Sequence, residues 1–248
     1  MIGLDICRNI PGIEYDLATE ADLEETAQAI EREGARALLR VADVRDPEAV
    51  RAVVDEGVAA FGRLDAVVAN AGVVAAGAVG AIPAEMWRTV AEIDLDGVWH
   101  TMTATVPHIR AGGRGGAILL ISSIAGLAPL THLTHYAAAK HGVVGIMRSL
   151  ANELGPEFIR VNTVNPTNVD TAMIHNSFGY RLMMPDVERP GRADAERPDG
   201  PYARPHAIPV PWVDPADVSA VVAFLLSDEA RYIAGVAVPV DAGWLVKH

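Results

Sequence analysis

The chain has 248 residues, 50% of them hydrophobic, and a mean hydropathy of +0.21, which excludes a globally disordered chain. Its net charge of −12, from 20 Lys and Arg against 32 Asp and Glu, disfavours nucleic acid and anionic membrane as partners. The single cysteine, Cys7, excludes an internal disulfide, and no apolar run approaches a membrane span, so we expect a cytoplasmic protein.

Short apolar runs alternate along the chain with longer segments of helical periodicity. In chain order, we expect strands at residues 2–5, 37–42, 64–69, 117–121, 159–164 and 237–240. Helices are expected between them at residues 20–33, 46–61, 84–109, 135–153 and 214–226. Apolar strands that alternate with helices predict one α/β domain over residues 1–248, with a doubly wound, Rossmann-type parallel sheet.

One segment, residues 166–212, interrupts this alternation and holds half of the chain's 16 prolines. A long irregular stretch inside a compact α/β domain favours a functional lid, and a disordered surface insertion is the alternative. Apolar side chains of the segment suggest an adaptable substrate wall, simple packing of the lid on itself, or both; they are Met173, Ile174, Phe178, Tyr180, Met183 and Met184.

Tyr136 and Lys140 are spaced four residues apart in a predicted helix, so their side chains share one face. A phenol with an ordinary pKa of about 10 is a poor base at neutral pH, but a nearby ammonium favours the phenolate. The pair could therefore move a proton, and a solvated helix face is the alternative interpretation.

Several polar residues follow predicted strands, where ligands of parallel sheets bind. Ser123 follows the strand at 117–121 and could hold a substrate oxygen, although an ordinary turn serine fits as well. Gly72, in the run Asn70-Ala71-Gly72, permits a tight turn and close approach of a ligand to the backbone. Asp43 with Val44 suits an adenine edge and face, and a helix-cap or loop aspartate is an equally good interpretation.

Asp5 ends the first strand, where a carboxylate can accept from both ribose hydroxyls and would repel a 2′-phosphate. We therefore expect NAD in preference to NADP. A surface turn residue is the alternative for Asp5, and Arg8 nearby weakens the preference.

Taken together, these residues resemble the classical short-chain dehydrogenase/reductase family. The matching motifs are Asp43-Val44, Asn70-Ala71-Gly72, Ile121-Ser122-Ser123, Tyr136 with Lys140, the run from Asn165 to Thr171, and Pro239-Val240-Asp241-Ala242-Gly243. Further motifs are similar to the carveol-dehydrogenase-like, mycofactocin-associated branch; they are Asp5-Ile6-Cys7, the glycine-rich run 112–116, His135-Tyr136, the run 139–145 and Val210-Pro211-Trp212-Val213.

The resemblance implies an NAD-dependent oxidation of a hydrophobic secondary alcohol, terpenoid or steroid-like, in a cytoplasmic homotetramer, with mycofactocin as a redox partner. It implies that Tyr136 is the acid/base, that Lys140 lowers its pKa and holds the nicotinamide ribose, and that Ser123 positions the substrate oxygen. It also implies cofactor contacts from Asp5, Ile6, Asp43, Val44, Asn70, Ala71, Gly72, Val169 and Thr171.

Two features depart from the family pattern. Asp94 stands where the family usually has an asparagine of a proton relay; beside Lys140 it would raise the pKa of that lysine. The chain also starts at what resembles the second strand, without the first strand and the glycine-rich turn that cradles a pyrophosphate. We expect an N-terminally truncated chain whose true start, with a TGxxxGxG-like turn, lies upstream of Met1.

Two rival interpretations remain at this stage. Without its phosphate cradle, the chain could be a catalytically inactive subunit or interaction module of the same fold. His132 and His135 form an HxxH pair, but no carboxylate or further histidine lies at ligand spacing, so we expect no metal site.

Overall fold

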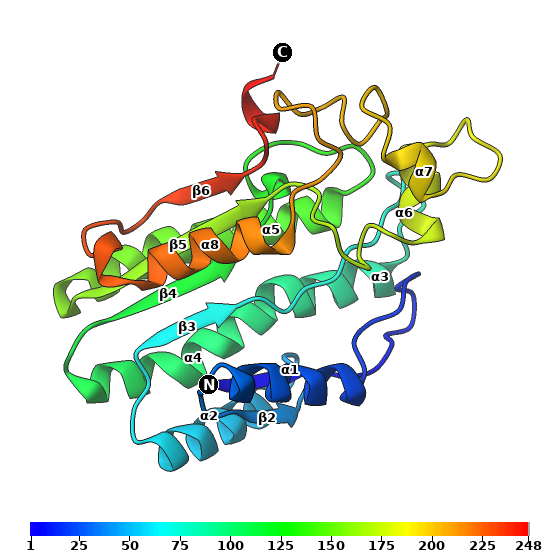
Figure 1. The fold of residues 1–248 in the computed structure, drawn as a ribbon. Coiled ribbons are helices and arrows are strands. Elements are labelled where there is room, and N and C mark those ends of the chain that lie inside the picture. The colour runs from blue at the N-terminus through cyan, green and yellow to red at the C-terminus, as the bar shows by residue number, and fades with distance from the viewer. Residues whose placement is uncertain (248) are drawn as a thin grey trace.

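All pairings between strands are parallel in the computed structural model, which describes residues 1–247 (Figure 1). The six strands are β1 (Ile2–Asp5), β2 (Leu38–Val41), β3 (Ala66–Ala69), β4 (Gly116–Ile121), β5 (Ile159–Pro166) and β6 (Ala237–Val240). β1 pairs with β2, and β3 to β6 form a second sheet in sequence order. Within the described residues β1 and β3 are not paired, so the sheet is in two parts.

Helices cover both faces of these strands, as the alternating pattern predicts (Figure 1). They are α1 (Glu20–Arg32), α2 (Pro47–Phe61), α3 (Ala84–Ala91), α4 (Gly97–Gly112), α5 (Thr134–Leu154), α6 (Ser177–Met183), α7 (Arg192–Ala195) and α8 (Pro215–Leu226). α8 lies in front of the second sheet in Figure 1, and α4 and α5 lie behind it.

Local sequence signals explain where helix α2 begins and ends. Asp46 caps α2, where its carboxylate accepts from Glu48 N and Ala49 N, and Pro47 occupies the first turn. Gly62 then ends α2 in the left-handed conformation, which glycine adopts without a steric penalty. The boundaries of α2 are therefore encoded within a few residues.

The segment predicted as one helix over 84–109 contains a π-helical turn, Glu92–Asp96, between α3 and α4. Such single turns insert an extra residue into a helix and are frequent at functional sites. Immediately after it, the backbone of Gly97 lies against Val44, where an added Cβ would approach the Val44 side chain to 2.7 Å. The turn thereby brings Asp94 into the protein interior, where its side chain is fully buried.

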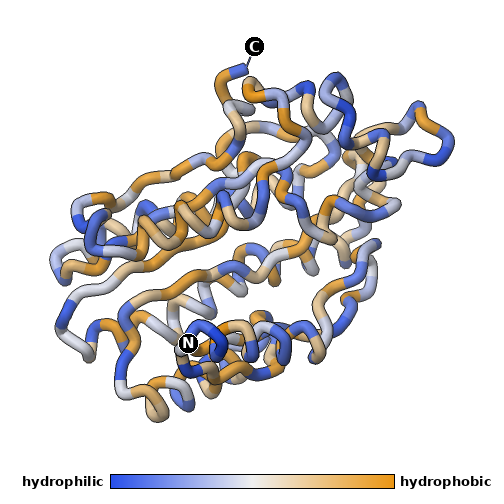
Figure 2. Tube along the Cα trace, in the orientation of Figure 1, coloured by the Kyte–Doolittle hydropathy of each residue, from blue (hydrophilic) through white to orange (hydrophobic). Residues whose placement is uncertain are grey.

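The main core lies between the second sheet and helices α4 and α5. Ile118 and Leu120 of β4 and Val161 of β5 pack there against Met147 of α5, and all four are buried. Figure 2 shows the same pattern as hydrophobic colouring along these strands. This packing fixes the carboxyl ends of the strands, where the predicted site residues follow.

The irregular segment 166–212 is folded and contains α6 and α7. Its apolar side chains pack mainly on one another; the cluster contains Ile174, Tyr180, Met183, Met184, Ala195, Tyr202 and Trp212. Within the described residues, these side chains therefore pack on the segment itself.

Candidate active site

Ser123 and Tyr136 meet at the carboxyl end of β4, as their sequence positions predict. Ser123 follows the strand in extended conformation, and its hydroxyl accepts from Ala125 N at 3.1 Å. Asn165 of β5 holds the same residue by donating to the Ser123 carbonyl at 2.9 Å. Tyr136 lies in the first turn of α5, where burial raises the pKa of its phenol and the Ser123 side chain opposes that rise. Ser123 and Tyr136 therefore both lie at the carboxyl end of β4.

Lys140 lies one helical turn after Tyr136 and is buried. Its Nζ is 5.5 Å from the centre of the Tyr136 ring, and it donates to the Ile121 carbonyl at 3.2 Å. The Lys140 carbonyl accepts from the Ser122 hydroxyl at 3.0 Å, which ties the start of α5 to the end of β4. The predicted common face of Tyr136 and Lys140 is confirmed by this geometry.

The buried carboxylate of Asp94 completes the group. Its Oδ2 lies 3.3 Å from Lys140 Nζ, and its Oδ1 accepts from Val73 N at 2.8 Å. Gly72 packs directly against this ion pair, because an added Cβ would stand 3.2 Å from Lys140 Nζ and 3.4 Å from Asp94 Oδ2. A side chain at this position would therefore press on the ion pair.

Burial and charge act in opposite directions on the three ionisable groups. Burial raises the pKa of Tyr136, and Asp94 raises it further, against the lowering effect of Lys140. Burial also raises the pKa of Asp94, although Lys140 opposes it. For Lys140, burial lowers the pKa, but Asp94 and Tyr136 together raise it above its ordinary value. Lys140 thus stays protonated, as the sequence predicts from Asp94.

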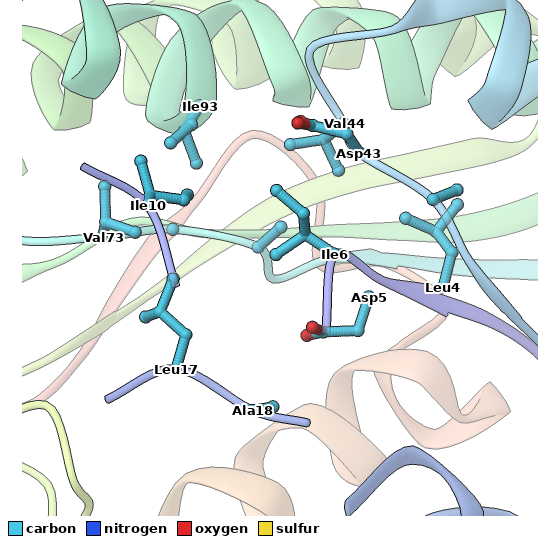
Figure 3. Close-up of a pocket in the computed structure, with 13 residues that line it drawn as sticks. Leu4, Asp5, Ile6, Ile10, Leu17, Ala18, Asp43, Val44, Val73 and Ile93 are labelled. Atoms are coloured by element: carbon cyan, nitrogen blue, oxygen red, sulfur yellow. The ribbon is translucent and has the colours of Figure 1, made fainter. Parts of the chain in front are cut away.

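A pocket beside this group has the lining expected for the adenosine half of a dinucleotide (Figure 3). Its walls carry both apolar side chains and two carboxylates; they include Asp5, Ile6, Asp43, Val44, Ala71, Gly72 and Ile93. Figure 3 shows Ile6, Val44 and Ile93 around the space, with Asp5 below them. Of the predicted cofactor contacts, Asp5, Ile6, Asp43, Val44, Ala71 and Gly72 meet here.

The two carboxylates that line the pocket, Asp5 and Asp43, differ in their hydrogen-bond and ion-pair partners. Asp5 uses Oδ1 to accept from Cys7 N at 2.8 Å, and no protein donor within residues 1–247 bonds to its Oδ2. Asp43 is paired through both oxygens with Arg45, and Arg8 lies 3.7 Å from its Oδ2. These partners lower the pKa of Asp43 against the effect of burial. Asp5 is therefore the better ribose acceptor.

Besides Tyr136 and Lys140 of the catalytic group, which are also predicted cofactor contacts, three predicted contacts lie outside this pocket. Asn70 is exposed at the end of β3. Val169 and Thr171 lie beyond β5 at the start of the 166–212 segment, where Val169 forms a parallel bridge with Val213. Their roles toward a cofactor stay predictions.

Tyr15 belongs to no motif or periodic pattern of the sequence, and sequence reasoning missed it. It is buried, and its hydroxyl accepts from Val74 N at 2.9 Å, next to the Asp94-bound Val73. The only signal is an aromatic residue among polar neighbours in a stretch without helix or strand. His132 is exposed and His135 buried, and residues 1–247 contain no group of three His, Cys, Asp or Glu side chains that could hold a metal ion. Among the same residues, no helix has the length and apolarity that crossing a bilayer requires.

Comparison with known proteins places these features in context. The family model for short chain dehydrogenase matches residues 2–179. The chain is 48% identical over its whole length to the (-)-trans-carveol dehydrogenase of Rhodococcus erythropolis and covers 88% of that relative. The crystal structure of carveol dehydrogenase from Mycobacterium avium in complex with NAD superposes with a TM-score of 0.96 at 47% identity, covering 98% of this chain and 87% of that one. The crystal structure of a short chain dehydrogenase from Mycobacterium paratuberculosis bound to NAD superposes with a TM-score of 0.87 at 40% identity. The match covers 97% of this chain and 86% of that one.

Proposed function

Because the chain belongs to the short chain dehydrogenase family, we propose that it is an NAD-dependent dehydrogenase that oxidises a hydrophobic secondary alcohol to a ketone. The observation that carries the proposal is the convergence of Ser123, Tyr136 and Lys140 at the end of β4. The NAD-bound relatives support the choice of cofactor. NAD, when bound, supplies the hydride acceptor.

The protein residues supply the proton transfer and the orientation. Tyr136 takes the proton of the alcohol as its phenolate, and Ser123 donates to the same substrate oxygen. The protonated Lys140 stabilises the phenolate, since a positive charge 5.5 Å from the ring favours the ionised form. In the reverse direction, the neutral phenol returns a proton to the ketone.

The pocket residues fit the adenosine half of NAD. The free Oδ2 of Asp5 can accept from a ribose hydroxyl, and its charge would repel the 2′-phosphate of NADP. Ile6 and Val44 offer apolar surface to an adenine face. Gly72 provides a wall that reaches from this pocket to the Asp94–Lys140 ion pair.

The substrate class is proposed from two sources. The carveol dehydrogenase relatives act on a terpenoid alcohol, as their name says, and we extend a terpenoid or steroid-like alcohol to this chain. Residues 166–212 form the proposed lid, and the half-buried Met173 and Phe178 are its candidate substrate contacts. A cytoplasmic homotetramer that passes electrons to mycofactocin completes the proposal, on the resemblance of the sequence motifs alone.

A catalytically inactive subunit is the rival, and the site geometry does not favour it. A chain without activity would have no need of a buried lysine paired with a buried carboxylate, because buried charges cost stability.

The test is oxidation of carveol and of a steroid alcohol with NAD, followed by the absorbance of NADH. We expect turnover by the wild-type chain and a loss of about 100-fold or more in Tyr136→Phe. Tyr232→Phe is the matched control, since Tyr232 is 90% exposed and precedes the amino end of β6, whereas the site lies at the carboxyl ends of the strands. Calorimetric titration with NAD separates the outcomes: a chain that binds NAD but oxidises no alcohol contradicts the substrate class, and one that binds no NAD contradicts the proposal.

A further inference from the structure

We propose that Tyr15 is a positioning residue for the Asp94–Lys140 pair, acting through the backbone of the turn at residues 72–74. Tyr15 belongs to the segment 6–19 between β1 and α1, far in sequence from every residue of the catalytic group. The expected effects on turnover rest on the proposed function, whereas the expected effects on hydrogen exchange and on the tyrosinate titration do not.

The first observation is the contact itself. Tyr15 is 7% exposed, and its hydroxyl accepts from Val74 N at 2.9 Å across 59 residues of sequence. The segment around it is also fixed: Ile10 and Ile13 pack in one cluster with Val73 and the Tyr136 ring. The hydroxyl is therefore a buried attachment point between this segment and the turn.

The second observation is that two residues of this turn contact the ion pair and the next residue contacts Tyr15. Gly72 packs against Lys140 Nζ and Asp94 Oδ2, and Val73 N donates to Asp94 Oδ1. Val74, the third, is the residue that Tyr15 holds. The Val73 and Val74 amides lie in adjacent peptide planes that share the Val73 Cα, so a displacement of the Val74 amide is passed to the Val73 amide through that shared atom.

The third observation concerns the chemical form of Tyr15. Burial raises the pKa of its phenol well above the ordinary value, and Asp94 and Tyr136 raise it too, against the lowering effect of the Val74 amide. Tyr15 thus stays neutral and does not exchange protons with the substrate. Its part is to hold the backbone, and Tyr136 carries the proton.

Removal of the Tyr15 hydroxyl should shift the pKa of Tyr136 in one definite direction. The Val73 amide lowers the pKa of Asp94, so its displacement makes the ionised carboxylate less stable. When a smaller fraction of Asp94 is ionised, its raising effect on the pKa of Tyr136 is weaker. Removal of the Tyr15 hydroxyl should therefore move the pH profile of alcohol oxidation toward acid, as replacement of Asp94 by asparagine should.

The experiment compares Tyr15→Phe with the wild type by amide hydrogen exchange, by tyrosinate absorbance and by kinetics. We expect exchange in residues 70–76 to rise about tenfold and kcat to fall by a similar factor, because a partly buried amide loses its partner. The tyrosinate titration assigned to Tyr136, by difference from the Tyr136→Phe protein, should move to lower pH. In the double variant Tyr15→Phe/Asp94→Asn, the shift of the pH profile should be smaller than the sum of the two single-variant shifts, since both act through the Asp94 carboxylate.

Thr105→Val is the matched control, because it removes a buried hydroxyl that bonds to the Thr101 carbonyl within α4, outside the catalytic group. It should leave exchange at 70–76 and the pH profile unchanged, even if its melting temperature falls. Unchanged exchange and an unchanged tyrosinate titration in folded Tyr15→Phe would overturn the proposal, and so would additive pH shifts. Absence of turnover in the wild type would instead contradict the proposed function, while exchange and titration would still decide the role of Tyr15.

Discussion

Replacement of Asp94 by asparagine tests the electrostatics of the site most directly. The carboxylate opposes Lys140, because its negative charge raises the pKa of Tyr136 while the lysine lowers it. The variant keeps the shape of the side chain and an oxygen that can accept from Val73 N. We expect Asp94→Asn to fold and to ionise Tyr136 at a lower pH.

The size of the shift follows from the distances. Asp94 Oδ2 lies 3.3 Å from Lys140 Nζ, which lies 5.5 Å from the centre of the Tyr136 ring. The carboxylate is therefore within about 9 Å of the ring, where a unit charge at an effective dielectric constant of about 20 contributes roughly 2 kcal/mol. Since one pKa unit corresponds to about 1.4 kcal/mol, we expect a decrease of about one unit.

The assay is the pH dependence of kcat/KM for alcohol oxidation and for the reverse ketone reduction. Oxidation needs the phenolate and rises with pH, whereas reduction needs the neutral phenol and falls with pH. Both midpoints should move about one unit toward acid in Asp94→Asn. Glu92→Gln, which neutralises a carboxylate on the exposed side of the same π-helical turn, should leave them unchanged. A midpoint of Asp94→Asn at the wild-type pH, or above it, would refute the electrostatic argument.

Three further predictions concern the cofactor pocket, the turn after β3 and the lid. Asp5→Ser should weaken the preference of kcat/KM for NAD over NADP by about 1–3 kcal/mol, because a charged acceptor facing the ribose is lost; an unchanged ratio contradicts that role. Gly72→Ala should lower kcat about tenfold or more with a smaller change in melting temperature, since the new methyl group would press on Lys140 Nζ; wild-type kcat would show that the ion pair can move freely. Limited proteolysis should cut the exposed residues 185–189 of the free protein and spare them with NAD and alcohol bound, and equal cleavage in both states would argue against a lid.

The sequence alone determined those features whose causes lie within a few residues. The caps of α2 and the four-residue spacing of Tyr136 and Lys140 are local, and the structure reproduces both. The strand–helix alternation placed Ser123 and Gly72 after strands, because the period of apolar residues reveals each element without knowledge of its neighbours.

Only the tertiary structure decided which of these residues contact one another. The carboxylate of Asp43 faces Arg45 as well as the pocket, and Ile174 and Met184 pack within the 166–212 segment. Tyr15 reaches Val74 across 59 residues, and Asp94 reaches Val73 across 21. Local periodicity contains no information on such pairs, since the partner of a buried polar group is chosen by what the packed backbone brings within hydrogen-bond distance.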